Sequence, residues 1–405
     1  MDFKIGIMNR LKKTIYNGIL AIAAMTLTVG CEDLALGENF LQKPPSTDVT
    51  IDTIFGKAEY AQRVLWKSYQ YLPYGMETPG FWTQMCMSTI EGLTDINYDN
   101  IGWSALSNTY YPGLYNAAVE NDTRKNSNRT KMQFSQSGFW TGVRHAWLFV
   151  QNVDRVPDMD AAEKSRLTAE AKMMVAVFYA HMLRHYGALP IIDHAISAED
   201  DKFPARATLQ ETVDFIVKLL DEAIACKDFP WNIDESERDN WDGRMTKAGA
   251  MALKTRVLLF VASPLFNDAK PFAEGEASDK KMTWFGGYDK ARWKQAADAC
   301  KDFFDALNAN GYYKLVEAGD KGIADERDAY TSAYFDRGNT ETLIACRRQY
   351  LATKNNGQFD KALRWGAYCP TKEFFDMFEM KDGRKFDWNN AEMKKNPLKN
   401  TDARL

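Results

Sequence analysis

Apolar residues recur at helical spacing along most of the chain, and the clearest case lies in residues 246–267. Four of its apolar residues share one helical face: Ala250, Leu253, Val257 and Val261. Residues 258–260 are also apolar and extend this surface most of the way round the last two turns. Since such a helix has little polar surface to present to solvent, the pattern predicts a buried, central helix.

The two ends of this helix are predicted by their capping chemistry. The Thr246 hydroxyl can accept from the free N–H groups of the first turn, and good helix formers follow it, with one exception at Gly249. Pro264 disfavours the helical conformation at Ser263, so the helix should end near Ala262.

The same periodicity predicts further helices at residues 51–71, 136–156, 160–185, 208–224 and 289–307. Gly187 suits the left-handed cap that would end the helix at 160–185, and Thr208 with Glu211 forms a capping box that would open the next one. Successive helices joined by short turns indicate stacked pairs, as in a tetratricopeptide solenoid, although its consensus repeat is absent.

Between these helices lie segments without sustained periodicity. Long irregular loops are predicted at residues 73–112 and 267–287, and a strand is predicted at 341–346. The chain should therefore be mostly α-helical, with helix pairs packed against a loop-rich region that holds few short strands.

The first thirty residues read as a targeting segment. Basic residues precede an apolar stretch at 15–30, which ends in Thr28-Val29-Gly30-Cys31. This ending resembles a bacterial lipoprotein cleavage box with Cys31 as the acylated residue; an ordinary signal peptide or an N-terminal membrane anchor is the alternative. We therefore expect a signal peptide at 1–30, a lipid-anchored tether at 31–50 and one globular domain at 51–405.

Composition narrows the function. Hydrophobic residues make up 45% of the 405 residues, which suffices for a sizeable core. A net charge of −4, without a basic stripe, argues against a nucleic-acid partner. Aromatic residues reach 13%, with 11 Trp and 18 Tyr, which suits either a large core or a platform for sugars. The six cysteines show no zinc spacing and are predicted as small buried hydrophobes, except Cys31.

Five stretches in this order resemble the SusD/RagB family, the surface lipoproteins with which Bacteroidota capture nutrients. The resemblance runs from Cys31 to about Arg404. In its second stretch the family favours an Ala-Glu-Ala-Lys opening and a Tyr-Gly-x-x-Pro exit. The five stretches are CED with the tether FLQKPPSTDVT, AEAKMMVAVFYAHMLRHYGALPII, PARATLQETVDFIVKLLDEAI, GRMTKAGAMALKTRVLLFVASPLFN and CPTKEFFDMFEMKDGR.

This resemblance implies a SusD-like fold and a non-catalytic role on the outer face of the outer membrane. Proteins similar to this one bind glycans, or peptides in the RagB branch, and close over a SusC-type TonB-dependent transporter. Family members are usually longer, so the C-terminal part of the domain is expected to be missing. The leading hypothesis is glycan capture for such a transporter, and peptide capture is the alternative.

Glycan capture needs aromatic faces for the apolar side of sugar rings and nearby polar groups for their hydroxyls. In the family this platform is typically assembled from an early loop and the loop after the SPLF segment. The competing interpretation is that the aromatic residues of both loops pin them onto the helices. The candidate ligand-binding residues are Trp82, Asp95, Asn97, Tyr98 and Trp103 in the early loop, with Trp284 and Tyr288 in or just after the later one.

An enzyme and a metal site were both considered against the sequence. The 55 acidic residues would always allow a glycosidase carboxylate pair to be imagined, and no motif singles one out. His181 and His185 have the i, i+4 spacing of metal ligands, but the Glu that a metalloprotease needs after the first His is absent. We therefore predict no catalytic residue, no metal and no cofactor.

Overall fold

A computed structural model describes residues 50–72, 90–100, 102, 106–116, 137–197, 200, 204–319, 323–345, 368–402 and 404–405. The chain divides into two compact units, Met1–Thr53 and Ile54–Leu405. Of the first unit the description covers residues 50–53, where helix α3 (Ile51–Ile54) begins. The rest of this account concerns the second unit.

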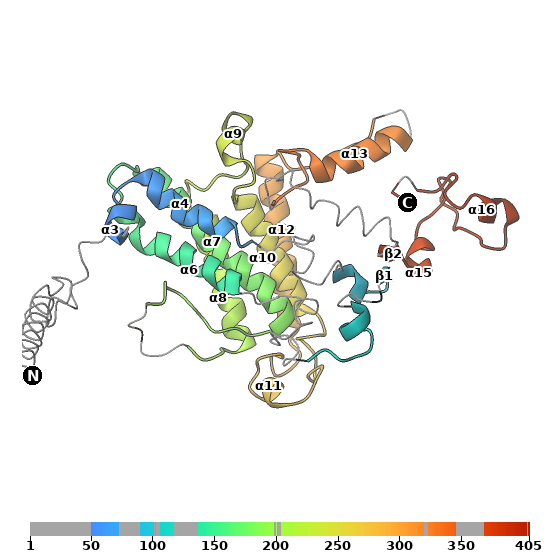
Figure 1. Ribbon diagram of the computed structural model, residues 1–405, viewed down its shortest axis with the longest axis horizontal. Coiled ribbons are helices and arrows are strands. Elements are labelled where there is room, and N and C mark those ends of the chain that lie inside the picture. The colour runs from blue at the N-terminus through green and yellow to red at the C-terminus, as the bar shows by residue number, and fades with distance from the viewer. Residues whose placement is uncertain are drawn as a thin grey trace, which may run out of the picture. The chain divides into compact units, whose positions relative to one another are not determined.

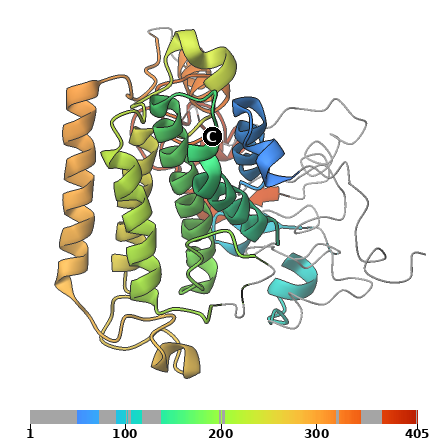
Figure 2. The same cartoon turned by 90° about the vertical axis from the view of Figure 1, so that its left-hand side faces the viewer.

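Six long helices form the body of this unit. Each packs against the next along the chain, α4 on α6, α6 on α7, α7 on α8, α8 on α10 and α10 on α12, and Figures 1 and 2 show them stacked side by side. This arrangement confirms the predicted mostly helical fold built from helix pairs. The helices are α4 (Ala58–Tyr69), α6 (Ser137–Asn152), α7 (Ala161–Tyr186), α8 (Leu209–Ala225), α10 (Lys247–Ala262) and α12 (Lys290–Asn310).

Short elements make up the remainder. Strands β1 (Asn97–Asp99) and β2 (Tyr368–Pro370) pair antiparallel, with Tyr98 opposite Cys369. The other α-helices are α9 (Arg238–Trp241), α11 (Glu276–Asp279), α13 (Ile323–Phe335), α15 (Lys372–Phe375) and α16 (Ala391–Lys395). The remaining helical turns are η2 (Ile90–Leu93), η3 (Leu106–Tyr110), η5 (Val153–Arg155) and η6 (Glu235–Glu237).

The strand predicted at 341–346 is wrong over its described part, residues 341–345, which form bends. The Asn339 side chain explains the difference, because its Oδ1 accepts from the backbone N–H of Glu341 at 3.0 Å and of Thr342 at 2.9 Å. An amide side chain that bonds the backbone two residues on bends the chain and takes away the donors a strand would use.

Helix α10 has the central position that its pattern predicted, since it packs against both α8 and α12. The Thr246 hydroxyl accepts from the Gly249 N–H at 3.2 Å, and the helix ends at Ala262. Leu259 is an exception to the burial, with 52% of its surface exposed.

Gly249 has a tertiary reason that its helix propensity does not reveal. A Cβ at this position would lie 2.7 Å from the Leu343 carbonyl oxygen, a backbone atom, and 3.1 Å from the Met173 Cε. We expect Gly249→Ala to lower the free energy of unfolding by about 1–3 kcal/mol, because overpacking outweighs the roughly 1 kcal/mol that alanine gains in helix propensity. Chemical denaturation measures this, with Lys247→Ala in the same turn as the control. A stabilised Gly249→Ala variant would contradict the close approach of residue 343.

A buried ionic group joins α4, α7 and the start of α10. Glu170 is 1% exposed, and its Oε1 accepts from Arg244 Nε at 2.5 Å and from the Tyr69 hydroxyl. The Tyr69 oxygen in turn accepts from the Met245 N–H at 3.0 Å. The Arg244 guanidinium also lies 4.7 Å from the centre of the Trp241 ring. Charge-assisted hydrogen bonds in a buried site of this kind fix how the helices meet.

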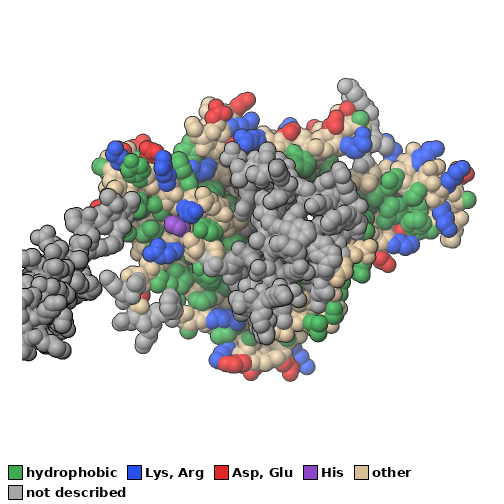
Figure 3. Space-filling model, in the orientation of Figure 1, with side chains coloured by type: hydrophobic (Ala, Val, Ile, Leu, Met, Phe, Trp, Pro, Cys, Tyr) green, Lys and Arg blue, Asp and Glu red, His purple; other side chains and the backbone are tan. Residues whose placement is uncertain are grey.

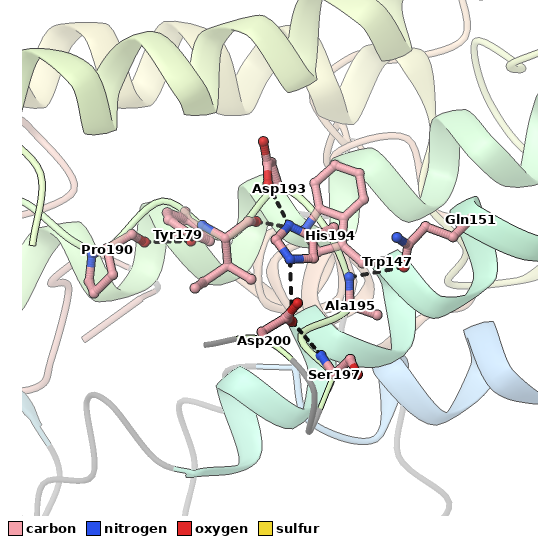
Figure 4. Close-up of polar contacts among 10 residues, drawn as sticks. Trp147, Gln151, Tyr179, Pro190, Asp193, His194, Ala195, Ser197 and Asp200 are labelled. Carbon is pink, nitrogen blue, oxygen red and sulfur yellow. Dashed lines mark hydrogen bonds and ion pairs between the residues drawn. The ribbon is translucent and has the colours of Figure 1, made fainter. Parts of the chain in front are cut away.

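The segment that crosses from α7 to α8 is held by backbone hydrogen bonds to side chains of the helices (Figure 4). Trp147 Nε1 donates to the Ile192 carbonyl at 2.8 Å, and the Tyr179 hydroxyl donates to Pro190 O at 2.7 Å. Further along, His194 Nδ1 lies 2.8 Å from Asp193 Oδ1, and its Nε2 lies 3.6 Å from Asp200 Oδ2. These contacts fix an irregular segment that has no regular secondary structure to do so.

Within the described ranges, no helix is long and apolar enough to cross a membrane.

Candidate ligand-binding site

Tyr98 on β1 offers an exposed ring that is supported from behind. The side chain is 52% exposed, and its ring stacks on Tyr111 with 5.3 Å between centroids and 7° between planes. Tyr111 is itself fixed, because its hydroxyl donates to the Gly92 carbonyl and accepts from the Asp99 N–H, both at 2.9 Å. Burial raises the pKa of Tyr111, so this hydroxyl keeps its proton and its donor role. A ring held on one face can receive a ligand on the other.

The two polar candidates beside Tyr98 are placed differently. Successive side chains of a strand point to opposite faces, so Asn97 faces away from the Tyr98 ring, on the side of the buried Asp99. Asp95 lies in the turn before β1 and is exposed. The Thr371 hydroxyl donates to the Asp95 carbonyl, and the Thr371 N–H donates to Ile96 O at 3.1 Å. The position of this turn thus depends on residues that come much later in the chain.

The later loop is closed by a buried asparagine, Asn267. Its Nδ2 donates to the Ala262 carbonyl at 3.2 Å and to the Asp289 carbonyl at 3.0 Å, while its Oδ1 accepts from the Asp289 N–H at 2.8 Å. These bonds join the end of α10 to the start of α12. Tyr288, which precedes the α12 cap, is consequently held at a defined point with 58% of its surface exposed.

Trp284 is half-buried in the same loop, and its indole N–H donates to the Asp268 carbonyl at 2.9 Å. Its polar group is therefore used within the loop, as the pinning interpretation expects, and the ring faces are what remains for a ligand. The structure brings Trp284 and Tyr288 together on one loop and Asp95, Asn97 and Tyr98 on another. Figure 1 shows the loop around α11 and the β1–β2 pair at separate places beside the long helices.

Two of the aromatic candidates, Trp82 and Trp103, and the lipidation candidate Cys31 lie outside the described residues. Sequence reasoning did not select Tyr111, which supports Tyr98, or Asn267, which closes the later loop. Tyr111 stands in an aromatic stretch without periodicity, so only the stacking contact distinguishes it from its neighbours.

The histidine pair on α7 is surrounded by positive charge and not by further metal ligands. The two rings lie with centroids 5.2 Å apart, and burial lowers the pKa of His181 to about 4 and that of His185 to about 3. Arg184 and Arg256 also lower the His181 pKa, and the same two positive charges would oppose a cation at this place. Among the residues with described side chains, no group of three or more His, Cys, Asp or Glu could hold a metal ion.

Comparison with known proteins gives a structural answer and no sequence answer. No sequence-family model matches the chain, and no curated protein matches it. Among solved structures, a SusD-like protein of Bacteroides fragilis superposes on 89% of this chain and 62% of its own, with a TM-score of 0.58 and 20% identity. The fold is SusD-like.

Two more solved structures share this SusD-like fold. One is described as a SusD-like carbohydrate-binding protein of Bacteroides fragilis, with a TM-score of 0.55, 17% identity, and coverage of 86% of this chain and 59% of that one. The other is a SusD superfamily protein of Bacteroides vulgatus, with a TM-score of 0.53, 15% identity, and coverage of 79% and 62%. The chain therefore spans 59–62% of the length of these proteins.

Proposed function

We propose that this chain is a non-catalytic glycan-binding lipoprotein of the cell surface, anchored through Cys31, which delivers oligosaccharides to a SusC-type TonB-dependent transporter of the outer membrane. The observation that carries the proposal is a SusD-like fold that presents Tyr98 as an exposed, supported ring. One of the structural neighbours with this fold is described as carbohydrate-binding.

The geometry of Tyr98 suits a sugar that must later be released. Its stacking on Tyr111 fixes the ring before any ligand arrives, so little side-chain entropy is lost on binding. Aromatic stacking contributes about 0.5–1.5 kcal/mol beyond the area that it buries. Several such contacts give a moderate affinity, and moderate affinity permits the release that delivery to a transporter requires. Trp284 and Tyr288 are proposed as the contribution of the later loop.

We expect wild-type protein to be retarded by at least one polysaccharide in affinity electrophoresis, and Tyr98→Ala to weaken that binding by roughly tenfold. Tyr98→Phe should bind as the wild type does, because it keeps the ring. Tyr60→Ala is the matched control, since Tyr60 is also exposed, at 39%, but lies on α4.

The outcomes separate the alternatives. Retardation by no glycan in a broad panel, with binding of peptides instead, would replace glycan capture by peptide capture. Release of reducing sugar by the purified protein would contradict the non-catalytic role. Co-purification with a TonB-dependent transporter from outer membranes tests the delivery step.

A further inference from the structure

A cleft of about 600 Å³ lies between α13 and the C-terminal segment 379–404, away from the residues discussed above. This volume falls within the ordinary range of small-molecule sites. Residues spaced four apart on a helix point to the same side, and three polar side chains of the α13 wall have this spacing. They are Glu326, Tyr330 and Tyr334. Ala329 and Ala333 line the cleft beside them, and their small side chains leave room for a ligand.

The opposite wall is formed by two backbone segments that hold each other in place. Met380 and Thr401 form an antiparallel bridge. On either side of it, the Lys381 N–H donates to Asn400 O at 2.8 Å, and the Asp402 N–H donates to Glu379 O at 2.9 Å. Figure 3 shows hydrophobic and basic side chains close together on the surface of the C-terminal segment. Paired backbone on one side and a helix on the other give the cleft two regular walls.

The α13 wall carries an exposed aromatic pair. Tyr330 is 50% exposed and Tyr334 is 67% exposed, and their ring centroids are 5.0 Å apart with 51° between the planes. Such large exposed rings on the wall of a cleft can stack on the apolar face of a ligand. Each ring restricts the movement of the other, which limits the entropy lost on binding.

The charges of the cleft have an excess of one sign. Asp402 is neutralised by Arg404, whose Nε and Nη2 donate to its two carboxylate oxygens at 2.9 and 2.6 Å. Glu341 is partly used, because its Oε1 accepts from the Val316 N–H at 2.7 Å. Within the described part of the chain, the exposed carboxylates of Glu326 and Glu379 form no ion pair. Lys381 alone of the lining cations is left to offset three carboxylates.

We infer that this cleft is a second carbohydrate site, which accepts neutral or amine-bearing sugar residues and rejects uronate and sulfated ones. Carboxylates accept hydrogen bonds from hydroxyl and ammonium groups, and the two tyrosine rings supply stacking faces. An anionic sugar would meet like charge in the same space, which provides specificity by repulsion. The inference rests on the proposed function for the existence of a glycan ligand, and it assigns the charge of the sugar.

The test titrates the full chain with three oligosaccharides of equal length, a neutral glucan, a glucosamine oligomer and an oligogalacturonate. We expect Tyr334→Ala to weaken binding of the neutral or the glucosamine oligomer by roughly tenfold. Glu326→Gln combined with Glu379→Gln should weaken the glucosamine oligomer further and strengthen the oligogalacturonate. Phe335→Ala is the matched control, because Phe335 is 76% exposed on α13 and does not line the cleft.

The result that overturns the inference is unchanged binding of all three oligosaccharides in Tyr334→Ala, or weaker binding of the oligogalacturonate alone. If Tyr98→Ala then still weakens glycan binding, the proposed function stands and only the second site is lost. If the wild-type chain binds no glycan at all, both proposals fail. Because Tyr334 is largely exposed, its truncation leaves the fold intact, and circular dichroism checks this.

Discussion

Replacing Glu170 with alanine is expected to lower the free energy of unfolding by about 3–5 kcal/mol, the largest loss from a single substitution that we predict. Glu170 is 1% exposed and accepts from both Arg244 and Tyr69. Although burial opposes the charged form of Arg244, the Glu170 carboxylate raises the pKa of that guanidinium above its usual value. Arg244 would therefore remain charged in the variant and would have lost its buried counter-charge.

Urea denaturation followed by circular dichroism measures this loss. Glu222→Ala is the matched control, because Glu222 also joins α7 and α8 through an ion pair, with Lys172, but its side chain is 36% exposed. We expect the control to cost no more than about 1 kcal/mol. Glu170→Leu combined with Arg244→Met should recover much of the stability, since it removes both charges. A single variant as stable as the control would show that the buried ion pair does not hold these helices.

Acidification is expected to destabilise the protein between about pH 6.5 and pH 4, through the histidine pair on α7. Burial, then the nearby positive charges, lower the pKa of His181 from 6.5 to about 4, and burial lowers that of His185 to about 3. In this interval the unfolded chain binds protons that the folded chain does not, so stability is fully present above pH 6.5 and is lost as the pH falls. The His181 shift alone corresponds to at most about 3 kcal/mol.

Thermal unfolding at pH 7.5, 6 and 5 tests this dependence. His181→Gln should flatten it, because a neutral side chain takes the place of one that must be protonated on unfolding. His194→Gln is the control, since the hydrogen bond with Asp193 raises the pKa of this exposed histidine and gives the opposite dependence. The contribution of His194 is present below its unfolded pKa and is lost as the pH rises through its folded pKa. An unaltered pH profile in His181→Gln would contradict the assignment.

Where an element is fixed by neighbours in sequence, prediction from sequence succeeds. The Thr208–Glu211 capping box forms as expected, with the Thr208 N–H donating to Glu211 Oε2 at 2.8 Å and the Glu211 N–H donating to Thr208 Oγ1 at 3.2 Å. Helix α7 ends at Gly187, which has a φ of 71°. These are contacts over three or four residues, and residue type alone decides them.

Where the partner is distant in sequence, prediction fails or has no signal to follow. The helix predicted at 51–71 is interrupted, and α4 begins at Ala58, whose N–H donates to Asp158 Oδ1 at 2.7 Å. Lys57, its preceding residue, makes no side-chain cap of its own. The pairing of β1 with β2 likewise joins segments that no short periodicity connects.

The candidate sites divide along the same line. The sequence by itself determined the helical framework, the central place of residues 246–267 and the choice of Tyr98 and Tyr288 as aromatic candidates on loops. Only the tertiary structure decided that Tyr111 supports Tyr98, that Asn97 faces away from it, and that α13 and the C-terminal segment enclose a cleft. The physical reason is that periodicity and capping act within a few turns of one helix, whereas a binding surface is made by side chains whose distance along the chain says nothing about their distance in space.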